Sequence, residues 1–528
     1  QYAIEKYGQD RVAHIVTFAT IKAKQAIRDA ARVLGLPFSS GDRVAKLMPP
    51  MILGNTATIS ECLSLDEENT SGYSKEFYSA SEELRKQYKN DEEAKQIIDI
   101  ALGLEGLRRQ DGIHAAAIVI SPDTITKFLP IQQKGSNAEI VTQYEMHTVE
   151  QLGLLKMDFL GLRNLSIVDR TLELIGSESL DIDNLKLDDE KTFKLFAEGK
   201  MTGVFQLESR VAQSTSRSLK PKRFEDIVAL VALIRPGPLG AGMHNEFADR
   251  ANNRKEIEYL HNDLESILNE TYGVILYQEQ VMQIAEKIAG FNLQEADNLR
   301  VAMGKKIPKV MEEQRKKFTD GAVSNNYSEQ FAIELFDQIA YFAGYGFNKS
   351  HSVPYALLAY QTAYLKANYP AEYIAACLTA VKRDKDRTAI FLSEARDMGV
   401  KVSTPDVNLS SSDFTVNDNE ILFGLSAVRN VGDITADKIV LERESNGHFE
   451  SIEDFLSRID SRSLNKRGVE ALIQGGGLDK FGLTRKGMFD SAIELIENAK
   501  ELKANKENNQ GSFCLLYTSD AADEELRG

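Results

Sequence analysis

The spacing of apolar residues changes near residue 161, and no other feature of the sequence constrains the fold as strongly. Before this point, short apolar runs bounded by turn residues predict strands at residues 15–18, 111–120, 142–144 and 154–159. Beyond it, apolar residues recur at helical spacing as far as about residue 404. The sequence therefore predicts an α+β protein of several domains, with a mixed sheet followed by a large all-helical part.

Residues 153–162 place a lysine and an aspartate inside an apolar run. We expect a short, mostly buried strand, a glycine turn and a helix that begins near Asn164. A carboxylate is unfavourable in an apolar interior unless it is paired or holds a metal. From this pattern alone, Asp158 caps the following helix, pairs with an arginine such as Arg163, or is a functional carboxylate. Lys156 would lie on the same face of the strand, so a simple ion pair with Asp158 is a further interpretation.

Composition and charge narrow the class of protein. The three cysteines, Cys62, Cys377 and Cys514, are far apart and lack metal-binding spacing, which argues against a disulfide framework or a zinc site. No apolar run is long enough to cross a bilayer and no signal peptide is recognisable, so we expect a cytoplasmic protein. The net charge of −16 describes solubility, whereas nucleic-acid binding depends on where the basic groups gather.

The densest basic run lies in residues 300–317. Its basic residues flank a Met303–Gly304 pair, where we expect a turn that lets the backbone approach a ligand closely. A run of this kind is often only a solvated surface, but its position around a turn favours an anion site. The basic residues are Arg300, Lys305, Lys306, Lys309, Arg315, Lys316 and Lys317.

A second polar cluster follows glycines at positions 344 and 346 and leads into an apolar helix expected over residues 353–363. A helix start of this kind presents amide groups and a cation to an anion. Arg235 opens an Arg-Pro-Gly-Pro sequence, in which proline and glycine stiffen and bend the chain. Each feature has an alternative role as a cap or a turn, and their presence together favours phosphate binding. The residues of the second cluster are Asn348, Lys349, Ser350 and His351.

Six sequence blocks occur in a fixed order, at residues 156–165, 204–209, 235–238, 271–282, 302–306 and 344–351. Together they resemble the bacterial DNA polymerase III α subunit family, the C-family replicative DNA polymerases. The resemblance extends from the first residue to about residue 482 and so includes nearly the whole chain.

The resemblance implies an order of domains. Residues 1–35 and 111–163 would form the palm, with residues 36–110 inserted as a helical thumb. Residues 164–404 would form all-helical fingers, and residues 405–513 the start of the clamp-binding region. Residues 514–528 depart from the family and resemble a translated sequencing adapter, so we expect a non-native tail.

The resemblance also implies roles for single residues. Asp158 would be one of three palm aspartates that bind the catalytic magnesium ions, with Lys156 beside the phosphates. We expect nucleotide contacts from the polar cluster and the basic run, namely Arg235, Arg300, Lys305, Lys306, Asn348, Lys349, Ser350 and His351. We expect DNA contacts from Lys309, Arg315, Asn430 and Gly432.

Residues 425–436 resemble a helix-hairpin-helix motif, with Asn430 where the first hairpin glycine is usual. Asparagine tolerates the left-handed conformation, so we expect the turn to form and its amides, with Gly432, to face a phosphate. Residues 465–478 resemble a second, partial copy. A helical hairpin without a ligand remains the alternative.

We therefore predict DNA-templated DNA synthesis with deoxynucleoside triphosphates and magnesium. The other two family aspartates have no counterpart before Asp158, so we expect an internal fragment that is inactive by itself. Partners implied by the resemblance are primer–template DNA, a sliding clamp, a clamp-loader subunit and a proofreading exonuclease, with no membrane. The alternatives are a non-catalytic helical DNA-binding scaffold and an error-prone relative of the same family.

Overall fold

The computed structural model describes residues 1–51, 56–64, 77–133, 135, 138–159, 161–176, 180–305, 308–343, 346–460 and 462–507. Within it the chain divides into two compact units, Gln1–Gly161 and Leu162–Gly528. The expected tail at residues 514–528 and the side chain of Lys306 lie outside the described residues.

The first unit is built on a mixed five-stranded sheet in the order β3-β4-β1-β2-β5. The strand β1 pairs antiparallel with β2 and parallel with β4, while β2–β5 and β3–β4 are antiparallel. The four strands expected from the sequence are confirmed, and β3 is an addition. Their bounds are Val12–Thr20 (β1), Arg108–Ile120 (β2), Ile131–Gln132 (β3), Val141–Glu145 (β4) and Leu155–Asp158 (β5).

The strand that carries Asp158 is exposed, and the expectation of a mostly buried strand is wrong. Leu155, Met157 and Asp158 are exposed, and only Lys156 is half-buried. The reason lies in the strand order, because β5 is at the edge of the sheet and pairs only with β2. The apolar run in the sequence did not distinguish an edge strand from a central one.

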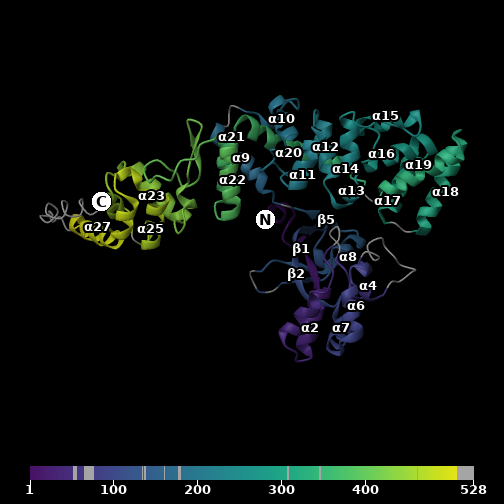
Figure 1. The fold of residues 1–528 in the computed structure, drawn as a ribbon, viewed down its shortest axis with the longest axis horizontal. Helices are drawn as coiled ribbons and strands as arrows, with labels where there is room; N and C mark the ends of the chain where they lie inside the picture. The colour runs from purple at the N-terminus through teal and green to yellow at the C-terminus, as the bar shows by residue number, and fades with distance from the viewer. Residues whose placement is uncertain are drawn as a thin grey trace. The chain divides into compact units, whose positions relative to one another are not determined.

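Helices inserted between β1 and β2 form a separate hydrophobic core in the first unit. Figure 1 shows α2, α6 and α7 together at one end of the sheet. Their apolar faces bury residues such as Ile27, Ile59 and Ile98 completely. The helices of this unit are Tyr2–Tyr7 (α1), Ala23–Val33 (α2), Phe38–Ala45 (α3), Ile59–Leu63 (α4), Glu82–Asn90 (α6), Glu92–Leu104 (α7) and Met146–Gln151 (α8).

The first part of the second unit is helical, as the apolar spacing predicts. Helix α20 runs through its main core against α10 and α12, and Tyr360 of α20 is fully buried there. The elements are Arg163–Ile175 (α9), Glu190–Glu198 (α10), Arg210–Leu219 (α11), Phe224–Leu233 (α12), Pro236–Gly240 (α13), Met243–Ala251 (α14), Glu265–Leu268 (α15), Gln278–Ala289 (α16), Leu293–Lys305 (α17), Pro308–Ser324 (α18), Glu329–Ala343 (α19), Lys349–Asn368 (α20), Pro370–Val381 (α21) and Lys385–Asp397 (α22).

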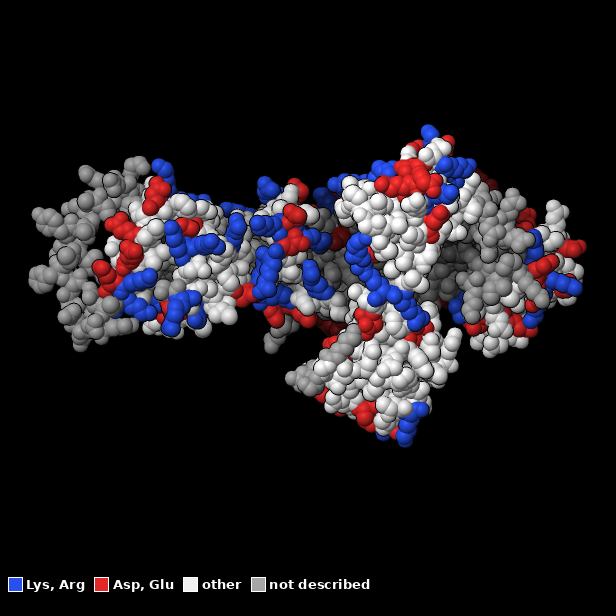
Figure 2. Space-filling model, turned by 90° about the horizontal axis from the view of Figure 1, so that it is seen from below, with Lys and Arg blue, Asp and Glu red and all other residues white. Residues whose placement is uncertain are grey.

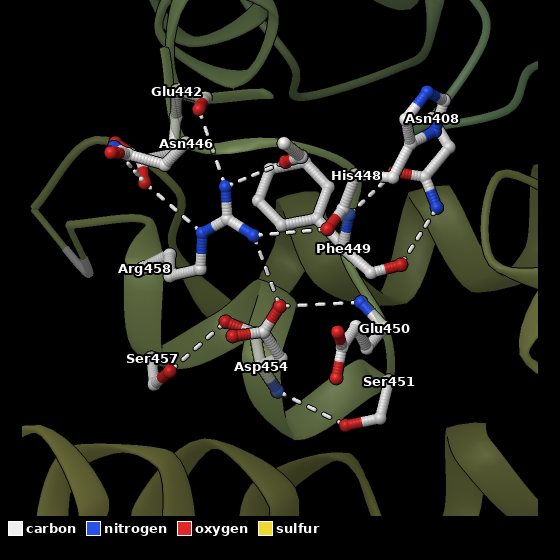
Figure 3. A network of polar contacts seen from close by, with 11 residues as sticks. Asn408, Glu442, Asn446, His448, Phe449, Glu450, Ser451, Asp454, Ser457 and Arg458 are labelled. Atoms are coloured by element: carbon white, nitrogen blue, oxygen red, sulfur yellow. Dashed lines mark hydrogen bonds and ion pairs between the residues drawn. The ribbon is translucent and has the colours of Figure 1, made fainter. Parts of the chain in front are cut away.

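The last part of the second unit has its own core of buried apolar residues. It contains a two-stranded hairpin, Thr415–Asn417 (β6) and Glu420–Leu422 (β7), followed by Asp433–Asn446 (α23), Ile452–Arg458 (α24), Lys466–Gly475 (α25), Arg485–Asp490 (α26) and Ala492–Glu507 (α27). In Figure 3, Arg458 of α24 reaches back to the end of α23. It pairs with Glu442 at 3.0 Å and donates to the carbonyl of Gly447 at 2.8 Å. These contacts join the two helices.

None of the described helices has the length and apolarity that a membrane span requires.

One glycine in the helical core makes a direct test of packing. A Cβ atom at Gly321 of α18 would collide with the backbone carbonyl of Ala289 at the end of α16. We expect Gly321→Ala to lower the stability of the second unit by about 1–3 kcal/mol, the usual cost of overpacking, measured by thermal denaturation.

A matched substitution provides the control. At Gly475, the last residue of α25, an added Cβ would meet only Pro405 at an ordinary 3.6 Å. Gly475→Ala should leave the melting temperature unchanged or raise it. Equal melting temperatures for the two variants would contradict the close helix contact at Gly321.

Candidate nucleic-acid interface

Asp158 ends β5 as an exposed carboxylate paired with its neighbour on the same strand face. The Nζ atom of Lys156 lies 2.7 Å from Oδ2 of Asp158, and the Asp158 side chain is 52% exposed. The simple ion pair considered from the sequence is therefore present. An exposed pair of this kind contributes less than about 1 kcal/mol to stability, so it leaves the carboxylate free to exchange partners.

The strand beside Asp158 is distorted. The register of β1 against β2 shifts between His14 and Val16, which pair with Ile118 and Ile113, so β2 bulges between these two pairs. His114 lies in this bulge, and its Nδ1 atom accepts hydrogen bonds from the amides of Ala116 and Ala117 at 3.2 and 2.9 Å. The imidazole therefore has the structural role that a lone histidine usually has. Bulges often occur beside functional groups, where they redirect a strand.

The described residues do not by themselves make up a magnesium site. Magnesium requires several oxygen ligands, and no group of three or more His, Cys, Asp or Glu side chains in the described part of the chain is arranged to hold a metal. Asp158 offers one carboxylate of the right chemistry, and a divalent ion there would need further ligands.

The start of helix α20 already holds anionic groups of the protein. Asn348 caps the helix by accepting a hydrogen bond from the amide of His351 at 2.8 Å. The carboxylate of Glu279 accepts from the amide of Lys349 at 2.9 Å and from that of Ser350 at 3.4 Å. The ammonium group of Lys349 pairs with Glu270 at 2.7 Å. The predicted preference of this helix start for an anion is thus met by glutamates that the sequence pattern did not point to.

Arg235 lies against the same cluster although it is far away in the sequence. Its guanidinium group stacks on the ring of Phe347 at 4.1 Å, and Phe347 precedes the helix cap Asn348. Burial lowers the pKa of Arg235, which remains a cation at neutral pH because its ordinary pKa is far above 7. The proline and glycine after it begin helix α13, so the expected bend is the first turn of a helix.

The basic run at residues 300–317 differs from the expectation in two ways. Met303 and Gly304 lie within α17, which continues to Lys305, so the expected turn at Gly304 is wrong. The glycine is tolerated there as a helical residue. Several of the basic side chains are also neutralised: Arg300 pairs with Asp297, Arg315 with Asp337 and Lys317 with Glu295, at 2.8, 2.6 and 2.8 Å. Lys305 ends α17 and Lys309 lies in α18.

The hairpin before α23 has the expected conformation. Asn430 is left-handed with φ 63°, which confirms the prediction for this position, and Gly432 is the N-cap of α23. The first residue of that helix, Asp433, pairs with Lys382 and Arg383. These two pairs lower the pKa of the Asp433 carboxyl group and join the hairpin to the end of α21.

A cleft of about 850 Å³ opens beside this hairpin. Three of its arginines, Arg396, Arg429 and Arg467, come from different elements, and all three are exposed. Figure 2 shows lysine and arginine side chains gathered over this part of the second unit. The sequence analysis missed these arginines, because they are far apart in the chain and no spacing connects them.

Comparison with known proteins identifies the class of the chain. Residues 1–161 match the model described as the bacterial DNA polymerase III alpha NTPase domain, and residues 164–326 match the bacterial DNA polymerase III alpha subunit finger domain. Residues 399–488 match a helix-hairpin-helix motif. The chain is therefore composed of domains found in bacterial DNA polymerase III α subunits.

Curated relatives agree over nearly the whole chain. The DNA polymerase III subunit alpha of Mycobacterium tuberculosis is 41% identical, over 98% of this chain and 44% of its own length. Those of Thermus aquaticus and Escherichia coli K12 are 44% and 41% identical, each over 95% of this chain and over 40% and 43% of their own lengths. The chain thus spans less than half the length of these relatives. It belongs to the bacterial DNA polymerase III α subunit family, and the resemblance recognised in the sequence is confirmed.

The contact between Glu279 and α20 yields a prediction. Glu279→Ala removes the acceptor of two helix-start amides, so we expect a loss of about 1–2 kcal/mol in the stability of the second unit, measured by denaturant unfolding. Glu286→Ala is the control, since Glu286 lies on the same helix and its side chain forms no ion pair with any described residue. Equal stability of both variants would show that Glu279 does not support the start of α20.

Proposed function

We propose that this chain forms the polymerising core of a DNA polymerase III α subunit. It would add deoxynucleotides to the 3′-hydroxyl of a DNA primer on a template, in the bacterial cytoplasm. The observation that carries the proposal is the match to this family over nearly the whole chain, together with the gathering of Arg235 and residues 348–351 in one place.

The domain roles follow the architecture. The sheet of the first unit, formed by residues 1–35 and 111–163, acts as the palm that presents Asp158. The helices of residues 36–110, which follow α2 in the insertion between β1 and β2, act as the thumb. Residues 164–404 act as the fingers, and residues 405–513 as a DNA-binding module that begins the clamp-binding region.

Asp158 contributes one carboxylate to a magnesium site, and Lys156 is its neutralising partner before substrate arrives. A magnesium pair supplies charge stabilisation to the attacking and leaving oxygens of nucleotidyl transfer. The role of Asp158 rests on its chemistry and its position at the exposed end of an edge strand beside a bulge.

The fingers hold the triphosphate through cations and helix-start amides. Arg235 and Lys349 supply charge, and Asn348, Ser350 and His351 shape the start of α20. Because Glu279 and Glu270 occupy these groups in the structure, a triphosphate must replace carboxylates that already neutralise the site. The basic run provides further charge through Arg300, Lys305 and Lys306.

Duplex DNA contacts the basic helices and the hairpin module. Lys309 and Arg315 of α18 bind phosphates of the DNA backbone, and the hairpin at Asn430 and Gly432 presents amides to a phosphate. The arginine cleft next to this hairpin adds positive charge, which makes binding depend on salt concentration. The sliding clamp, the clamp-loader subunit and the exonuclease are proposed partners of the whole polymerase.

The first test removes the charge of Asp158. In a full-length α subunit that carries this sequence, Asp158→Asn should reduce primer extension by several orders of magnitude, because a neutral amide is a poor ligand for magnesium. Thermal denaturation should show an unchanged fold, since the carboxylate is exposed.

Asp183→Asn is the matched control, because Asp183 is an exposed acidic residue of an acidic loop and should be neutral in both assays. Extension at the normal rate by Asp158→Asn would exclude the assignment. It would favour a non-catalytic DNA-binding scaffold for the chain.

A second test separates nucleotide binding from DNA binding. Lys349→Met in the same protein should lower the efficiency of nucleotide use by roughly ten- to a hundredfold, the factor for a lost charge-assisted contact of about 1.5–3 kcal/mol. The affinity for primed DNA should change much less. If DNA affinity falls and nucleotide efficiency does not, the start of α20 contacts the template–primer and not the triphosphate.

A further inference from the structure

Gln206 adopts a backbone conformation that its residue type disfavours. Its φ angle is 62°, in the left-handed region, which costs a non-glycine residue roughly 1 kcal/mol or more. The residue is exposed, and among the described residues its side-chain amide has no hydrogen-bond partner. No hydrogen bond from its own side chain to a described residue therefore stabilises this conformation.

The other left-handed residues of the described chain have a local reason for their conformation. Lys220 ends helix α11 as its C-cap. Tyr272 is fixed by its side chain, because its hydroxyl donates to Asp226 at 2.9 Å and its ring packs on Phe247 at 5.2 Å. The remaining five are Asn or Asp, which tolerate the left-handed region: Asn253, Asn326, Asp418, Asn419 and Asn430. Gln206 also has a local backbone reason, because it is the third residue of a turn that the Leu207 amide closes on the Val204 carbonyl at 3.3 Å. That position favours Gly or Asn, so a glutamine there remains strained.

The backbone on the N-terminal side of Gln206 is held by buried polar groups. The ammonium group of Lys366, which is almost fully buried, donates to the carbonyls of Lys200 and Thr202 at 2.7 and 2.8 Å. The Tyr373 hydroxyl donates to the carbonyl of Gly203 at 2.8 Å.

Two further contacts hold Phe205, directly before Gln206, and Glu208, two residues after it. The amide of Phe205 donates to Thr362 at 3.1 Å. Arg387 makes two hydrogen bonds to the Glu208 carboxylate, at 2.9 and 3.1 Å. Strained backbone persists where its surroundings over-determine it, and such sites are often functional.

Aromatic contacts place this loop at the proposed nucleotide site. The ring of Phe205 packs on Tyr355 at 5.4 Å, and Tyr355 packs on His351 at 4.4 Å. His351 in turn contacts Phe347 at 5.4 Å, on which Arg235 stacks. The residue next to Gln206 is thus connected through adjoining rings to the cations that would hold the triphosphate.

We propose that Gln206 is a further substrate-contacting residue of this site, and that its amide binds a neutral polar edge of the substrate. That edge is the nucleobase or sugar of the incoming nucleotide or of the templating nucleotide. A carboxamide both donates and accepts hydrogen bonds, which suits a base or sugar, whereas the phosphates are matched by Arg235 and Lys349. This inference rests on the proposed polymerase function. It adds a residue and a substrate group that the proposed function does not include.

Replacement by glycine separates the side chain from the backbone. Glycine adopts φ 62° without strain, so Gln206→Gly in the full-length subunit should preserve or raise the melting temperature. It also removes the amide, so kcat/KM for nucleotide incorporation should fall roughly five- to tenfold, the factor for one neutral hydrogen bond. Asn326→Gly is the matched control, because Asn326 is an exposed left-handed residue at the end of α18 and should change neither kinetics nor the response to template sequence.

The assay distinguishes the two sources of the bound group. A higher KM for the nucleotide, with unchanged DNA affinity, assigns the contact to the incoming nucleotide. Loss in DNA affinity, or in only some template bases, assigns it to the template. Gln206→Asn keeps an amide and suits the left-handed region, so it should retain part of the activity that Gln206→Gly loses.

Two results would overturn the inference. If Gln206→Gly extends primers with wild-type kinetics and wild-type DNA affinity, the residue is structural, and the polymerase function stands without it. If the full-length wild-type subunit extends no primer under any condition while remaining folded, the proposed function fails, and the role of Gln206 fails with it.

Discussion

The polar side chains of helix α20 are the interactions on which the second unit depends. The helix is buried on all sides along its central turns, so each polar group there must find a partner. Ser352 donates to the carbonyl of Val228 at 2.7 Å, Tyr360 to that of Lys186 at 2.9 Å and Gln361 to that of Ile182 at 3.0 Å. Two more side chains hold the segment before α11: Thr362 accepts a hydrogen bond from the amide of Phe205, and Lys366 donates to the carbonyl of Lys200. A single helix thereby bonds to the backbone of helix α12 and to the segments that precede α10 and α11.

The same helix couples the core to the proposed nucleotide site. Its first turn lies at the protein surface and carries the cap Asn348 and the paired Lys349, while its later turns are fixed in the core. The amides at its start therefore have a defined direction without a ligand. Preorganised donors of this kind lower the cost of binding, because few groups must be ordered when the anion arrives. The carboxylate of Glu279 stabilises this arrangement and at the same time competes with any triphosphate.

Sequence patterns predicted the elements whose signals are local. Apolar spacing and turn residues located β1, β2, β4 and β5, and the tolerance of asparagine for the left-handed region predicted the hairpin at Asn430. Features that depend on tertiary pairing were not accessible in this way. An apolar run does not say whether a strand lies at an edge, which is why the exposure of β5 differed from expectation. A Met-Gly pair does not reveal that helix α17 continues through it.

The ion pairs of the proposed nucleotide site show most clearly that tertiary pairing could not be predicted from the sequence. The cations of the basic run and of residues 348–351 were visible in the sequence, but apart from Asp297, which pairs with Arg300 within α17, the carboxylates that neutralise them come from other elements. Glu279 of α16 and Glu270, which precedes α16, reach Lys349 at the start of α20 only in the folded unit. The arginines of the cleft beside the hairpin likewise meet only in the folded unit.

Tyr355 explains how the charged and neutral sides of the proposed site are held together. It lies between His351, which belongs to the start of α20, and Phe205, which precedes the strained Gln206. Aromatic pairs of this kind contribute about 0.5–1.5 kcal/mol beyond their buried area, and they are directional. The ring therefore restrains the spacing between the start of α20 and the backbone at Phe205, which precedes Gln206. A site that must hold a phosphate and read a neutral edge at the same time requires such a fixed spacing, because an error in it would weaken both contacts together.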